Sequence, residues 1–158
     1  MRRINTRRTA GFSLIELLVV VAIIMIIMGM AIPSFQAARK LALETAAMKA
    51  ISTIHVAQAQ YQSQYGRFAA TMVELGPPVT GSPSASSAKL IGSDLASGEK
   101  GGYKYNLVAS DFGYSIHANP IAFNKTGDHT YFSDESLVIR QNSTSEPATE
   151  TSPEVNAR

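Results

Sequence analysis

The chain has 158 residues, 45% of them hydrophobic, no cysteine, and a formal net charge of +2. The lack of cysteine excludes disulfides, thiolate metal sites and cysteine nucleophiles. The positive charge is local, because four of the 14 basic residues precede Gly11 and all 12 acidic residues follow it, which leaves residues 12–158 with a net charge of −2. This distribution argues against a nucleic-acid-binding surface.

Residues 1–11 form a short polar leader that contains Arg2, Arg3, Arg7 and Arg8, and an apolar run from Phe12 to Phe35 follows. A helix over this run would be roughly 36 Å long at 1.5 Å per residue, enough to cross a hydrocarbon core of about 30 Å. The sequence therefore predicts a membrane-spanning helix over residues 12–35. A basic leader ahead of such a helix is typical of a segment that stays on the cytoplasmic side.

Glu16 lies inside the apolar run. An ionisable side chain at the centre of a bilayer costs about 3 kcal/mol or more, so Glu16 is a candidate functional residue. An ordinary secretory signal, cut near Gly29-Met30-Ala31, fits less well, because its apolar region is usually about 7–15 residues long. Arg7-Arg8 suggests a twin-arginine signal, but the surrounding residues fit poorly. A plain single-pass anchor, with Glu16 at the membrane interface, stays open as an alternative.

Pro33 is expected to interrupt the helix, because proline removes a hydrogen bond and clashes with the preceding turn. Beyond it the pattern predicts an amphipathic helix over residues 36–66, with Gly66 as the stop signal. The two segments together predict one helix of roughly 55 residues, from Phe12 to Tyr65. The residues of its apolar stripe are Met48, Ile51, Ile54, Tyr61 and Tyr65.

Residues 67–140 read as a connection followed by a small sheet. Alternation over Tyr103–Leu107 and Tyr114–Ala118, with a turn at Asp111-Phe112-Gly113, predicts one hairpin, and residues 130–133 and 137–140 predict another. Three or four antiparallel strands covering the helix stripe define an α+β fold. Residues 141–158, rich in Ser, Thr, Glu and Pro, are expected to form a disordered tail.

Beyond the apolar run, the sequence offers few candidates for a catalytic or metal-binding site. His55, His117 and His129 are isolated in the sequence, and no hydrolase, phosphate-loop or zinc motif occurs. We therefore expect no enzyme, no cofactor and no metal. An alternative in which Asp128, Asp134 and Glu135 hold Ca²⁺ stays open, although their spacing matches no defined calcium loop.

The run Gly11-Phe12-Ser13-Leu14-Ile15-Glu16-Leu17 resembles the cleavage and methylation signal of type IV prepilins, a family that includes pilins and the pseudopilins of type II secretion. Residues 95–103 and 131–140 also resemble segments of pilin and pseudopilin heads, more loosely. The resemblance implies a pilin-like fold, and a prepilin peptidase that cuts between Gly11 and Phe12 and methylates the new amine of Phe12. It places the precursor in the inner membrane, with the leader cytoplasmic and the head periplasmic.

The function implied by this resemblance is structural: a subunit that polymerises, with the help of an inner-membrane assembly platform, into a helical filament of identical copies. Glu16 would pair with the Phe12 amine, its own or a neighbour's, and the Pro33 region would bend or locally melt during assembly. A type IV pilus at the cell surface is the first interpretation. The alternatives are a type II secretion pseudopilin that forms a short periplasmic piston, to which the missing head disulfide points, and a membrane-anchored periplasmic binding domain that never polymerises.

Overall fold

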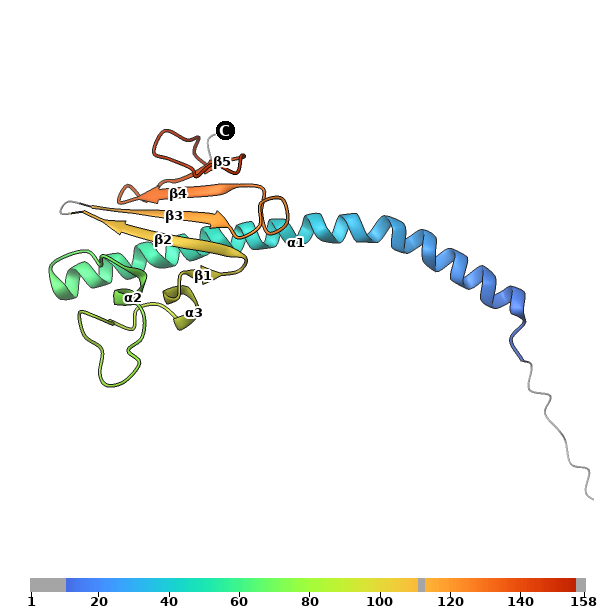
Figure 1. Cartoon of the computed structure of the whole chain (residues 1–158), viewed down its shortest axis with the longest axis horizontal. Coiled ribbons are helices and arrows are strands. Elements are labelled where there is room, and N and C mark those ends of the chain that lie inside the picture. Colours follow the sequence, from blue (N-terminus) through green and yellow to red (C-terminus); the bar gives the residue numbers. More distant parts are fainter. Residues whose placement is uncertain (1–10, 111–112, 156–158) are drawn as a thin grey trace, which may run out of the picture. The chain divides into compact units, whose positions relative to one another are not determined.

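The computed structural model describes residues 11–110 and 113–155. Residues 1–10 of the predicted leader, Asp111 and Phe112 of the predicted turn, and residues 156–158 of the predicted tail lie outside the described residues. The chain divides into two compact units, Met1–Ala37 and Ala38–Arg158. Helix α1 (Leu14–Tyr65), 52 residues long, runs through both (Figure 1).

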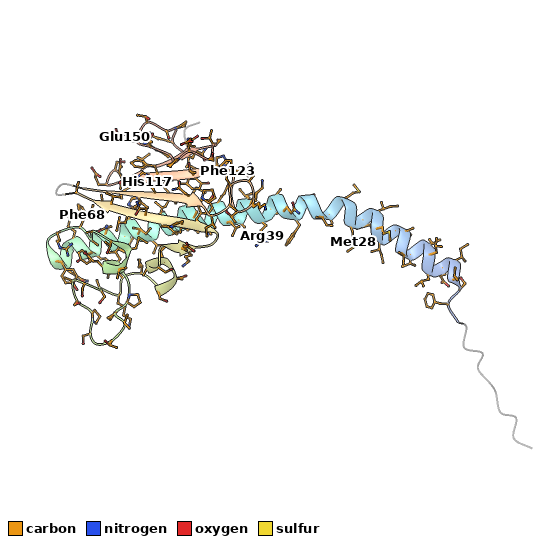
Figure 2. The ribbon with its side chains drawn as sticks, viewed as in Figure 1. Met28, Arg39, Phe68, His117, Phe123 and Glu150 are labelled. Carbon is orange, nitrogen blue, oxygen red and sulfur yellow. The ribbon has the colours of Figure 1, made fainter. Side chains whose placement is uncertain are left out.

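The first unit is the apolar part of α1. An 18-residue window in this helix has a mean hydropathy of 2.9, and none of the window is buried. The side chains, Met28 among them, project from the helix without cover (Figure 2). By length and composition this helix could cross a membrane. The helix is continuous through Gly29 and Pro33, so the expected interruption is not a break in the helix.

In the second unit, the rest of α1 packs on the sheet through the predicted stripe. Ile51, Ile54 and Tyr61 are completely buried, and Met48 and Tyr65 are partly buried against the same core. The stripe is therefore confirmed. Alanines widen it, because their small side chains let the backbone of α1 approach the sheet closely; the buried ones are Ala47, Ala50 and Ala57.

The sheet is antiparallel and has five strands in the order β1-β2-β3-β4-β5. Their bounds are β1 (Glu99–Lys100), β2 (Tyr103–Ala109), β3 (Tyr114–Pro120), β4 (Thr130–Asp134) and β5 (Ile139–Asn142). The α+β class and both predicted hairpins are confirmed, with one strand more than expected. The extra strand is β1, which is two residues long and turns into β2 through Gly101 and Gly102, both with positive φ. This is the glycine conformation that tight hairpins require.

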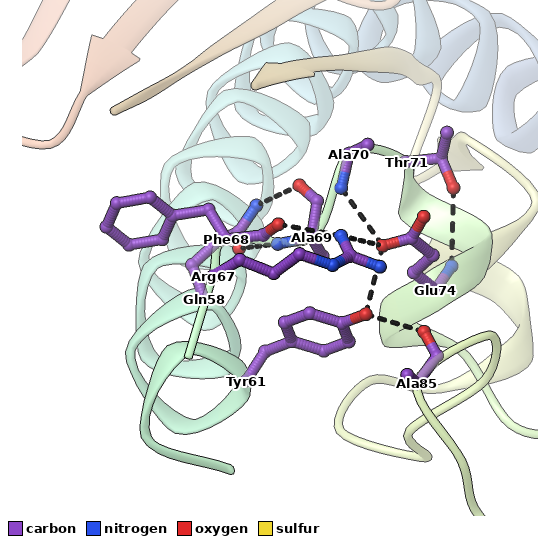
Figure 3. Close-up of polar contacts among 9 residues, drawn as sticks. All are labelled: Gln58, Tyr61, Arg67, Phe68, Ala69, Ala70, Thr71, Glu74 and Ala85. Atoms are coloured by element: carbon purple, nitrogen blue, oxygen red, sulfur yellow. Dashed lines mark hydrogen bonds and ion pairs between the residues drawn. The ribbon is translucent and has the colours of Figure 1, made fainter. Parts of the chain in front are cut away.

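Two short helices, α2 (Met72–Leu75) and α3 (Ser93–Ala96), lie in the segment between α1 and the sheet. A polar cluster fastens this segment to α1 (Figure 3). The side-chain amide of Gln58 bonds both the N–H and the carbonyl of Ala69, each at 2.9 Å. Glu74 accepts hydrogen bonds from Tyr61 at 3.1 Å and from Arg67 at 2.9 Å. Burial raises the pKa of Tyr61, so its phenol stays a donor.

The expectation of a disordered tail over residues 141–158 is wrong for residues 141–155. The tail begins inside β5, and Ala148 is completely buried. The N–H of Gln141 donates to the carbonyl of Pro153 at 2.9 Å, and that of Val155 to the carbonyl of Ile139 at 3.0 Å. Backbone pairing along the free edge of β5 therefore takes the place of the large apolar side chains that the tail lacks, and it also covers an exposed strand edge.

Removing residues 143–158 should therefore destabilise the second compact unit, Ala38–Arg158, which is called the head below. Each hydrogen bond lost contributes about 1 kcal/mol, so the expected loss is about 2–4 kcal/mol, or a melting temperature lower by about 5–10 °C. Thermal unfolding of the full-length and truncated proteins in the same detergent measures it. As a matched pair, Ala148→Glu at the buried site should destabilise and Ala42→Glu on an exposed turn of α1 should not. An unchanged melting temperature for the truncated chain would contradict the packing described here.

Candidate functional site

The predicted cleavage position lies just ahead of α1. Gly11, Phe12 and Ser13 are not helical and are exposed. A Cβ added at Gly11 meets no atom within 4 Å. The fold therefore does not require glycine at position 11. A small residue there is explained better by a requirement from outside the chain, such as the narrow cleft of a peptidase.

Ser13 and Glu16 start the helix together. The Glu16 N–H donates to the Oγ of Ser13 at 3.2 Å, and the Leu17 N–H donates to the Ser13 carbonyl at 3.2 Å. Ser13 thus occupies the cap position and Glu16 the third helical position, which is the spacing of a capping box. Sequence reasoning missed this role, although the pattern Ser-x-x-Glu ahead of an apolar run signals it. A carboxylate in the first turn also suits the helix dipole.

Glu16 forms no ion pair within residues 11–110 and 113–155. It lies four residues after Phe12, one helical turn from the amine that cleavage would create. The structure therefore places Phe12 and Glu16 at the same end of the helix, with the carboxylate exposed. The observed cap bond uses the backbone N–H of Glu16 and does not need its carboxylate, whereas pairing with a cation needs the charge.

At Pro33 the helix lacks one backbone donor, so the carbonyl of Gly29, four residues earlier, receives no N–H from position 33. The hydroxyl of Ser34 donates to the carbonyl of Met30 at 3.4 Å, one residue along. Hydroxyl bonds of this kind, next to a missing backbone bond, mark a point where a helix opens at low cost. Pro33 stays a candidate assembly residue on this ground.

His55, which appeared isolated in the sequence, is the centre of a buried hydrogen-bond chain. Its Nδ1 lies 2.7 Å from the hydroxyl of Tyr114, and its Nε2 lies 2.8 Å from the Oγ of Ser133. The Ser133 hydroxyl donates to the carbonyl of Val138 at 2.9 Å, so Nε2 carries the proton and Nδ1 accepts from Tyr114. Burial raises the pKa of Tyr114 to about 12, which keeps its phenol a donor. This hydrogen-bond chain ends at the carbonyl of Val138, so its role is structural.

Burial lowers the pKa of His55, against an opposing contribution from Asp134. The folded head therefore binds this proton less readily than the unfolded chain, so stability is present above the ordinary histidine pKa of about 6.5 and is lost as the pH falls below it. We expect the wild-type melting temperature to fall between pH 7.5 and pH 5.0 by more than that of His55→Gln. Parallel slopes for the two proteins in thermal melts would contradict this assignment, since every other titrating group is shared.

The alternative calcium set is not brought together. Asp128 pairs with Lys40 at 2.6 Å and precedes β4, whereas Asp134 ends that strand, roughly 20 Å away at about 3.3 Å per residue. Glu44 is buried and accepts from the N–H of Asp128 at 2.7 Å and from His129 at 3.0 Å. Within the described residues, no three His, Asp or Glu side chains gather as a metal site.

Residues 6–32 match the protein family described as Prokaryotic N-terminal methylation motif. The chain thus carries the N-terminal methylation motif that is typical of type IV pilins and type II pseudopilins, and the motif indicates a structural rather than an enzymatic protein. Together with the 52-residue helix and the antiparallel sheet, the arrangement is pilin-like. No curated protein and no solved structure matches the chain.

Proposed function

We propose that this chain is the subunit of a type IV pilus-like filament, assembled through its N-terminal helix after cleavage between Gly11 and Phe12 and methylation of Phe12. The observation that carries the proposal is the methylation motif over residues 6–32 at the start of a helix whose apolar surface is uncovered. A helix that is apolar on all sides needs either lipid or other helices around it. A filament core supplies such helices when the subunit leaves the membrane.

Assembly on this proposal exchanges lipid contacts for contacts between identical helices. The gain in apolar burial is small, because lipid is as apolar as the helices, so the specific polar contact decides the register. Glu16 supplies that contact by pairing with the Phe12 amine of a neighbouring subunit. In an apolar environment this pair is strong, and either charge alone is penalised.

The N-terminal helix also sets the proposed location. The precursor crosses the inner membrane once, with the arginine-rich leader in the cytoplasm and the head in the periplasm. A prepilin peptidase that also methylates, and an inner-membrane assembly platform, are the proposed partners. The finished filament stands on the cell surface.

A type II secretion pseudopilin is the second candidate, and the cysteine count favours it. The resemblance implies that many pilin heads close their C-terminal segment with a disulfide, and this chain has no cysteine. Here hydrogen bonds such as that between Gln141 and Pro153 hold the segment instead. A pseudopilin would form a short filament confined to the periplasm.

Negative-stain imaging of material sheared from the surface of cells that produce the protein tests the proposal. Long filaments that contain this chain are expected. Their absence, with the mature protein held in the inner membrane, would favour the pseudopilin. Protein that stays monomeric in the membrane after cross-linking would favour the non-polymerising binding domain.

A further inference from the structure

The loop between β3 and β4, residues 121–129, lies at the end of the head where α1 enters it. Asp128 accepts from the ammonium group of Lys40 at 2.6 Å, and its backbone N–H donates to Glu44 at 2.7 Å. Lys40 follows Phe35, the end of the predicted membrane span, by about 8 Å of helix. The loop is therefore fixed to the part of the head that is nearest, along the chain, to the apolar span.

Internal hydrogen bonds give this loop a defined form. The N–H groups of Lys125 and Thr126 donate to the carbonyl of Ala122 at 3.0 and 2.9 Å. The N–H of Asn124 donates to the carbonyl of Gly127 at 2.9 Å. Asn124 has a φ of +65°, which asparagine tolerates better than most residues. Because the loop is already ordered, a contact made through it costs little conformational entropy.

Apolar side chains at this end of the head are poorly covered. Ile121 is 57% exposed on the loop, and Leu41 is 64% exposed on α1. Phe123, which Figure 2 labels on the loop, is partly exposed. Single exposed apolar residues are common on protein surfaces. Here an isoleucine and an aromatic residue lie two positions apart on an ordered loop, and side chains of this kind enter the boundary between lipid headgroups and acyl chains.

The exposed charges around these side chains are cationic. Arg39, labelled on α1 in Figure 2, and Lys125 on the loop are both exposed. Neither takes part in an ion pair within the part of the chain that the structure describes. The two acidic residues nearby are compensated, because Asp128 pairs with Lys40 and Glu44 is buried. Arg39 and Lys125 thus leave this end of the head positively charged.

This positive charge is local. Residues 38–158 as a whole contain 10 basic and 11 acidic side chains. The turn between β1 and β2 borders the loop, since the N–H of Ile121 donates to the carbonyl of Gly102 at 2.9 Å. This turn carries two lysines, one opposite Glu99 across the strand pair and one bonded to an aspartate of α3, so it is close to neutral. An apolar tip framed by cations matches the chemistry of an anionic phospholipid surface.

We propose that this loop docks on the anionic phospholipid surface of the leaflet from which α1 emerges. Ile121 and Phe123 enter the headgroup level, and Lys125 and Arg39 contact phosphate groups. The inference rests on the proposed membrane location of the unassembled subunit and goes beyond its role in a filament. Interfacial anchors set the tilt and rotation of a membrane helix, so docking fixes how the head is presented before assembly.

Single-tryptophan variants test the docking, because the natural chain has no tryptophan. The full-length protein with Ile121→Trp is reconstituted into vesicles of equal parts phosphatidylglycerol and phosphatidylcholine brominated in its acyl chains. Bromine quenches tryptophan on contact, so we expect this variant to lose most of its emission. Val79→Trp, at a fully exposed position of the head, should keep its emission. Met25→Trp, inside the apolar helix, should be quenched in the same vesicles.

Neutral vesicles, in which plain phosphatidylcholine replaces phosphatidylglycerol, separate docking from simple tethering by α1. Ile121→Trp should be quenched far less in them. Adding Arg39→Gln and Lys125→Gln to Ile121→Trp should have the same effect in anionic vesicles. Each cation at an anionic surface favours the docked state about fivefold, so losing both should lower the ratio of docked to undocked heads about 30-fold. The melting temperature should not change, because both side chains are exposed.

The outcomes separate the docking from the proposed location. If Met25→Trp is not quenched, the membrane location fails and the docking fails with it. If Met25→Trp is quenched but Ile121→Trp is not, the docking is wrong and the location stands. Equal quenching of Ile121→Trp in neutral and anionic vesicles would also overturn the docking. A blue shift of its emission with rising protein content, without quenching, would assign the surface to a second copy instead. None of these readouts depends on filament formation.

Discussion

Cells that carry Glu16→Gln are expected to hold mature protein in the membrane and almost no sheared filament. The change removes the charge at one position in the first turn of α1 and leaves a shape that still suits a capping box. Losing one partner of a buried ion pair costs about 3–5 kcal/mol, so the subunit contact should weaken about a hundredfold or more. Quantifying the chain in membrane and sheared-surface fractions measures the effect.

Ser13→Ala is the matched control for this variant. It removes the hydroxyl that accepts from the Glu16 N–H and leaves the carboxylate in place. Losing such a cap costs about 1 kcal/mol of helix stability, so filament yield should fall far less than in Glu16→Gln. If Glu16→Gln gives normal filaments, or a filament yield no lower than that of Ser13→Ala, Glu16 does not set the register.

Gly11→Leu is expected to leave the full-length precursor in the inner membrane. The structure shows open space around Gly11, so the substitution should not disturb folding. The side chain would instead obstruct the proposed peptidase, and a tenfold loss of cleavage corresponds to about 1.4 kcal/mol in the activation barrier. Immunoblotting of the precursor and mature forms is sufficient, because they differ by 11 residues.

Gly29→Leu serves as the control for Gly11→Leu. Gly29 is also a glycine with no atom within 4 Å of an added Cβ, but it lies inside α1, beyond the predicted cleavage position. The same bulk added there should leave cleavage unchanged. Equal precursor accumulation in both variants would show that the defect lies in membrane insertion, and normal cleavage of Gly11→Leu would remove Gly11 from the proposed site.

The parts of the fold that follow from local patterns were predictable. The stripe through Ile51, Ile54 and Tyr61 has helical spacing, and all three side chains are completely buried. The alternation in β2 and β3 likewise marks which side chains face α1. These signals are strong because hydrophobic burial repeats with the period of the helix or the strand.

The parts that depend on contacts distant in the sequence were not predictable. Burial of His55 is compensated by Tyr114 and Ser133, which lie 59 and 78 residues away. The tail was expected to be disordered from its composition, yet backbone pairing with β5 orders residues 141–155 without needing large side chains. The turn between β4 and β5 holds Leu137 at a φ of +66°, which no local pattern of residue types announces.

The central claim is that this chain is cut after Gly11, methylated and polymerised. Intact-mass and N-terminal mass spectrometry of subunits recovered from sheared filaments tests it most directly. The account predicts a chain that begins with N-methylated Phe12 and retains the whole apolar helix. A mature chain that begins after Ala31, or an unprocessed chain that still carries residues 1–11, would contradict it.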